Sequence, residues 1–269
     1  MPVPMSGAMA PDAFAWSTAV LSLGVAVVYL MAARRLRRRG DRWPPVRDAG
    51  FTAGAALVAA ALLPLPGGGF TAHMGEHLLV AMVAPVLLVT ARPVTLALRA
   101  LPAGTLRRRL LSVSRSRAVG WLLCPPVAAV VDIGGLWLLY RTPLFAESRH
   151  RPWLHALIHV HLLAAGVLFT LALCQLDPVR SWYGLPLRAA VLVGAGTAHS
   201  VLAKLLYGTA PPGTAFSNHD LARAAELMYY GGDLVEIALA AALAHQWYAA
   251  GGRRLRHRNR REALAGTAR

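Results

Sequence analysis

The sequence predicts an all-α membrane protein, a polytopic bundle of about seven transmembrane helices. Three observations predict this fold: 56% of the 269 residues are hydrophobic, only 15% are charged, and the mean hydropathy is +0.47. A soluble domain carries about 25% charged residues. The apolar stretches recur along the whole length, so a globular domain with a single anchor does not fit the pattern.

Seven stretches approach the roughly 20 apolar residues that a helix needs to cross a bilayer. They cover residues 14–33, 50–66, 71–91, 118–140, 153–174, 186–206 and 229–249. The second stretch is short and ends in the proline and glycine run up to Gly69. The fourth contains Pro125 and Pro126, which predict a kink. Residues 1–252 are therefore expected to form one transmembrane domain, followed by a basic cytoplasmic tail over residues 253–269.

The basic residues predict how the bundle is oriented. Most of the 28 lie after the first, third and fifth stretches and in the tail beyond Gly252. By the positive-inside rule these segments face the cytoplasm, which places the N-terminus outside and the C-terminus inside. The net charge of +16 is then explained by arginines that orient the helices in a lipid bilayer, and it does not predict nucleic acid as a partner. No Lys or Arg precedes Phe14, so the first stretch is expected to stay as a helix and not to be a cleaved signal.

Two histidine pairs give the strongest functional signal: His73 with His77, and His155 with His159. Residues four apart lie on one face of a helix, one turn from each other. Both pairs open stretches that run in the same direction, so they lie at one depth near the extracytoplasmic face. Ionisable side chains are costly in a bilayer and mostly serve function there. One such pair would be explained by side chains reaching water, but two favour a shared metal or cofactor site.

Further polar residues are expected at a similar depth. His199 is either another ligand or the partner in an interhelical hydrogen bond. Glu76, Asp132 and Asp233 would orient imidazoles or accept released protons, and structural pairing within the bundle is the alternative. Glu236 serves either proton transfer or packing. A proton-coupled transporter that uses these carboxylates is therefore one rival function.

The donor set leaves several chemistries open. Imidazole suits copper, zinc, iron and nickel, whereas magnesium and calcium prefer oxygen ligands. Pairs one turn apart do not suit two stacked hemes, although a single bis-histidine heme in a membrane electron carrier stays open. The segment His73–His77 also matches H-x-x-E-H, in which Glu76 of an intramembrane zinc hydrolase would activate a metal-bound water. The pair His155 and His159 lacks such a glutamate, so metal handling ranks above hydrolysis and no catalytic residue is assigned.

Longer runs of the sequence resemble the multi-pass CtaG family of cytochrome c oxidase assembly factors. The resemblance covers about Gly50 to Trp247 and is strongest from His73 to Arg99. The runs that carry it include His73-Met74-Gly75-Glu76-His77-Leu78-Leu79, Arg92-Pro93-Val94-Thr95-Leu96, Pro152-Trp153-Leu154-His155-Ala156-Leu157-Ile158-His159 and Ala198-His199-Ser200-Val201-Leu202.

This resemblance implies a multi-pass protein of the bacterial plasma membrane that serves a caa(3)-type heme–copper oxidase of the respiratory chain. The role it implies is copper delivery, with oxidase subunits as partners and an extracytoplasmic copper chaperone as the donor. We expect the bound cofactor to be copper, in the form of Cu(I), and rank zinc and heme below it. No substrate would be transformed, so the protein is expected to be a metal-handling assembly factor and not an enzyme. The candidate copper contacts are His73, His77, His155, His159 and His199.

Overall fold

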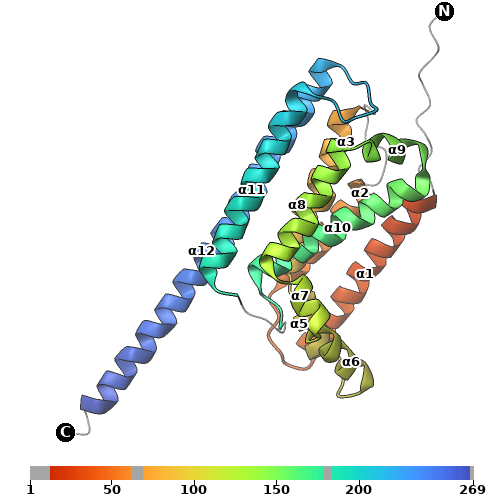
Figure 1. Cartoon of the computed structure of the whole chain (residues 1–269). Coiled ribbons are helices and arrows are strands. Elements are labelled where there is room, and N and C mark those ends of the chain that lie inside the picture. The colour runs from red at the N-terminus through yellow and green to blue at the C-terminus, as the bar shows by residue number, and fades with distance from the viewer. Residues whose placement is uncertain (1–12, 62–68, 179–182, 267–269) are drawn as a thin grey trace, which may run out of the picture.

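The computed structural model describes residues 13–61, 69–178 and 183–266, and this part of the chain is helical, without a strand (Figure 1). The predicted all-α class is thereby confirmed. The longer helices are α1 (Ala13–Arg38), α2 (Pro45–Ala61), α8 (Pro125–Arg141), α10 (Pro152–Cys174), α11 (Leu185–Gly208) and α12 (Asn218–Gly266). The shorter ones are α3 (Phe70–His77), the π-helix η1 (Leu78–Val83), α4 (Ala84–Thr90), α5 (Pro93–Ala100), α6 (Thr105–Ser114), α7 (Arg117–Leu122) and α9 (Leu144–His150).

Five helical segments in the described part of the chain are long and apolar enough to cross a membrane. A sixth is added if α8 and α9, which meet at a 76° bend, form one broken span. The other five are Ala15–Arg38, Phe70–Ala100, Pro152–Cys174, Leu185–Gly208 and Asn218–Ala249. The predicted stretch 50–66 corresponds to α2, which has 17 residues and is not one of these membrane-spanning candidates. Residues 62–66 of that stretch lie outside the described residues. The structure therefore supports five or six of the seven predicted spans.

The fourth predicted stretch contains a break between two helices, not a kink within one. α7 ends at Leu122, and α8 begins at Pro125 with both prolines in its first turn. Proline lacks the backbone N–H that a helix interior needs but is well suited to a first turn, where that N–H has no intrahelical acceptor. The backbone of α12 stays helical to Gly266, into the segment predicted as a basic tail.

The helices bring three remote segments of the chain to one end of the bundle. The start of α3, the bend between α8 and α9, and the connection from α11 to α12 lie together there, with α6 and its arginines at the opposite end (Figure 1). We call the first of these ends the histidine end. α11 packs along α12, α3 packs on α12, and α10 packs on α8, η1 and α4.

The π-helix η1 directly follows His77 in the chain. Such segments are rare and occur often at functional sites. α10 crosses η1 at Gly166, where an added Cβ would collide with the carbonyl oxygen of Ala81. Only glycine permits this approach, which brings α10, and with it His159, close to the helix that carries His73.

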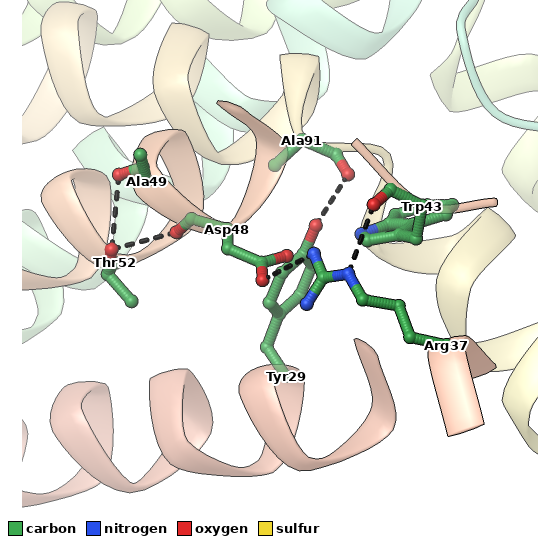
Figure 2. A network of polar contacts seen from close by, with 7 residues as sticks. All are labelled: Tyr29, Arg37, Trp43, Asp48, Ala49, Thr52 and Ala91. Atoms are coloured by element: carbon green, nitrogen blue, oxygen red, sulfur yellow. Dashed lines mark hydrogen bonds and ion pairs between the residues drawn. The ribbon is translucent and has the colours of Figure 1, made fainter. Parts of the chain in front are cut away.

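A polar network holds α1, α2 and the end of α4 together (Figure 2). The Tyr29 hydroxyl donates to the carbonyl of Ala91 at 2.9 Å. Arg37 donates to the carbonyl of Trp43 at 3.1 Å and to the carboxylate of Asp48 at 2.7 Å. Arg37 thus fixes the turn between α1 and α2, beyond any part it has in orienting the bundle.

Candidate metal site

The start of α3 is fixed by a carboxylate from α12. Asp220 accepts hydrogen bonds from the backbone N–H groups of Phe70 (2.7 Å) and Thr71 (3.1 Å) and from the Thr71 hydroxyl (2.6 Å). The first N–H groups of a helix have no acceptor within that helix, and a negative charge is favourable there. Asp220 therefore sets the position of the helix that carries His73 and His77, although the two segments are about 150 residues apart in sequence.

The carboxylate of Glu76 lies between two imidazoles from different helices. Its Oε2 atom is 3.8 Å from His73 Nδ1 and 3.9 Å from His159 Nε2. With metal–nitrogen and metal–oxygen bonds of about 2 Å, two ligand atoms on one ion lie about 3–4 Å apart. Both distances fall in that range. We call His73, Glu76, His155 and His159 the outer group.

Hydrogen bonds hold the other ring nitrogens of His73 and His159. His159 Nδ1 lies 2.9 Å from the carbonyl oxygen of His155 and donates to it, because a carbonyl can only accept. This tautomer leaves a lone pair on Nε2, the nitrogen nearest to Glu76. His73 Nε2 is 3.0 Å from the hydroxyl of Tyr140 on α8. One held nitrogen and one available nitrogen per ring is the usual arrangement of metal-binding histidines.

His155 lies against His159, as the spacing of four residues predicts. Their ring centroids are 4.2 Å apart with 49° between the planes. His155 is half-buried, whereas His159 is only 5% exposed.

A second, inner group consists of His77, His199 and Glu236. The two rings are each 1% exposed, and their centroids are 6.2 Å apart with 24° between the planes. His199 Nδ1 is 3.7 Å from Glu236 Oε1. Both nitrogens of both rings are buried without a hydrogen-bond partner among the described residues. Buried polar atoms are nearly always paired, so four such nitrogens in one place point to a ligand.

A small, mostly apolar cavity adjoins the inner group. Its volume is about 30 Å³, enough for about one water molecule. Asp132 and Thr170 share its wall with His77, His199 and Glu236. Asp132 thus lines the same cavity as two of the predicted histidines. Asp233 is half-buried one turn before Glu236, and it is Glu236 whose carboxylate is close to His199.

The structure brings all five predicted histidines into two neighbouring groups. Within the described ranges, no three His, Cys, Asp or Glu side chains already surround a single point as ligands of one ion do. Either group would have to close around an ion by side-chain rotation. The sequence analysis did not single out Tyr140 or Asp220. Neither belongs to a motif, and each acts on a helix far away in sequence, so no local signal identifies them.

Comparisons with known proteins identify the family and some relatives of the chain. The family model described as cytochrome c oxidase caa3 assembly factor (Caa3_CtaG) matches residues 27–250. The uncharacterized protein Mb0105 of Mycobacterium bovis is 35% identical over 168 residues, which cover 57% of this chain and 25% of that protein. The uncharacterized protein ML1998 of Mycobacterium leprae is 33% identical over 177 residues, which cover 62% of this chain and 26% of that protein. The chain thus spans about a quarter of the length of these relatives. No solved structure matches.

The family match includes every residue of the outer and inner groups and most of the helical bundle. It confirms the resemblance that covers about Gly50 to Trp247 and is strongest from His73 to Arg99. The chain belongs to the cytochrome c oxidase caa3 assembly factor family.

Proposed function

We propose that the chain binds Cu(I) through the buried histidines of its bundle and helps to load a heme–copper oxidase with copper during assembly. The observation that carries this proposal is the Glu76 carboxylate, which lies between His73 and His159 at distances suited to a shared ion. Family membership supplies the link to oxidase assembly. The donor chemistry supplies the link to copper, since imidazole is among its preferred ligands.

The location of the site supports a role in transfer and not only in storage. The outer group lies near the histidine end of the bundle, within about two helical turns of Phe70 at the start of α3. The opposite end carries the arginine-rich helix α6. By the positive-inside rule this supports an extracytoplasmic position for the histidine end in a bacterial plasma membrane. Copper would arrive there from a chaperone and leave by ligand exchange with an oxidase subunit.

The zinc hydrolase alternative finds less support in the geometry. In the H-x-x-E-H motif both histidines would bind the same ion as the water that Glu76 activates. Here His73 faces Glu76, whereas His77 belongs with His199 in the inner group. The two histidines of the motif therefore have different neighbours.

The proposal is tested by metal analysis of the purified full chain. The protein would be loaded with Cu(I) under reducing conditions, and bound copper would be measured by mass spectrometry alongside an optical spectrum. We expect His159→Ala to bind less copper than the wild type, while His245→Ala, an exposed histidine elsewhere on α12, binds as much. A Soret band would indicate a heme protein instead. Copper bound equally by the wild type and His159→Ala would refute the role of the outer group.

A further inference from the structure

We infer that the inner group binds a metal ion of its own, so that the chain holds two ions at neighbouring depths and not one ion shared by all five histidines. The site is formed by His77 on α3, His199 on α11 and Glu236 on α12. The ligand class is a transition-metal cation that accepts imidazole donors, and its identity as Cu(I) rests on the proposed function.

The spacing of the two rings fits a shared ion. With metal–nitrogen bonds of about 2 Å, an ion held between two imidazoles keeps their centroids about 6 Å apart. The centroids of His77 and His199 are 6.2 Å apart. The pair His155 and His159, at 4.2 Å, is too close for that arrangement.

The third donor comes from the neighbouring helix. Glu236 Oε1 lies 3.7 Å from His199 Nδ1, within the separation of two ligand atoms on one ion. Its negative charge would offset that of a cation in a part of the protein with little water. Asp132 lies on the wall of the same cavity.

The hydrogen bonding of the inner group differs from that of the outer group. Each outer imidazole, His73 or His159, has one nitrogen held by a hydroxyl or a carbonyl oxygen. The inner rings have no such partner within the described residues, although they are more deeply buried. Unpaired polar atoms are unfavourable in such surroundings. A cation would satisfy one nitrogen on each ring, which explains why two neutral histidines are kept there.

The crossing of α11 and α12 is shaped around these side chains. The ring of His199 lies against Gly232 of α12, and the carboxylate of Glu236 lies against Gly196 of α11. A Cβ at either glycine would collide with the facing side chain. Glycine weakens a helix relative to alanine, so this reciprocal arrangement is an unfavourable choice unless the space is needed. The space is occupied by two of the three proposed donors.

Tyr140 lies between the two groups. Its hydroxyl is near His73, and its fully buried ring meets His77 edge-on, with centroids 6.3 Å apart. A side chain that contacts histidines of both groups keeps two ions apart.

The number of ions per chain tests the inference. Cu(I) would be titrated into the purified full chain against a competing chelator, with bound copper measured by mass spectrometry. We expect two ions in the wild type, one in His199→Gln, one in His159→Ala and two in the control His245→Ala. X-ray absorption of the copper left in His159→Ala should show a low-coordinate shell of nitrogen and oxygen donors.

A second variant guards against misfolding of His199→Gln. Gly196→Ala keeps every donor but displaces Glu236, so it should weaken only the inner site, by at least tenfold. Gly194→Ala is its matched control, because a Cβ at Gly194 meets no atom within 4 Å. One ion in the wild type, lost in both histidine variants, would overturn the two-site inference and leave the proposed function standing. No bound copper in the wild type would overturn both.

Discussion

At the scale of single residues, Glu76 is the side chain on which the outer group depends. It is partly buried in a membrane bundle, and its carboxylate is close to two histidines, one from its own helix and one from α10. A carboxylate at such a depth is unfavourable unless it is paired. The negative charge, and not only the hydrogen-bonding capacity, is therefore what Glu76 contributes to a cation site.

Replacing Glu76 by glutamine tests that contribution. Glu76→Gln keeps the size of the side chain but removes its charge, so the affinity of the outer site for Cu(I) should fall about 10–100-fold, as for other groups that support metal ligands. Competition with a Cu(I) chelator measures this. Glu147→Gln is the matched control, because Glu147 is exposed and pairs with Arg151 on the surface. Equal affinities in both variants would exclude Glu76 from the site.

Sequence patterns predict some residues of the site and not others. The spacing of four residues and the shared depth were enough to select His73, His77, His155 and His159. The sequence analysis favoured Asp233 as the supporting carboxylate, whereas Glu236 is the one close to His199. Residues three apart share a helix face, so a small rotation of α12 decides which of them meets His199. α12 is apolar on most sides within the bundle, so its periodicity does not reveal that rotation.

At the scale of helices, the histidines are positioned by contacts between segments far apart in the chain. α3 is positioned by Asp220 at the start of α12, and α10 approaches η1 at Gly166. The existence of the helices was predictable because backbone groups in lipid must be satisfied within the segment. The π-helix was not predictable, since no local pattern distinguishes Leu78–Val83 from an ordinary apolar helix.

Removing the Asp220 carboxylate tests this positioning. Asp220→Ala leaves the first N–H groups of α3 without their acceptor, which should cost about 1–2 kcal/mol, as for other helix caps. A lower melting temperature in detergent and faster hydrogen exchange over residues 70–77 are expected. Asp41→Ala removes only a surface pair with Arg99 and should cost less than about 1 kcal/mol. If exchange over 70–77 is the same in both variants, α12 does not fix the start of α3.

At the scale of the whole molecule, orientation decides whether the histidine groups can exchange copper with an extracytoplasmic partner. The hydropathy pattern predicts seven spans, and the described residues contain five or six candidates. An odd number of spans would place the two ends of the chain on opposite sides of the membrane. Hydropathy does not settle a helix as short as α2, so the distribution of arginines is the stronger guide to orientation.

Labelling of single cysteines tests the orientation directly. In a variant without Cys124 and Cys174, Ala215→Cys reports on the connection from α11 to α12 at the histidine end, and Ala103→Cys reports on the exposed segment before α6. A maleimide that cannot cross membranes should label Ala215→Cys in intact cells, and Ala103→Cys only after lysis. The reverse pattern would place the histidine end in the cytoplasm, where the copper would have to come from a cytoplasmic donor and could not be handed to the outer side of the oxidase. Because the arginines next to Ala103 resist translocation across the membrane, we expect the first pattern.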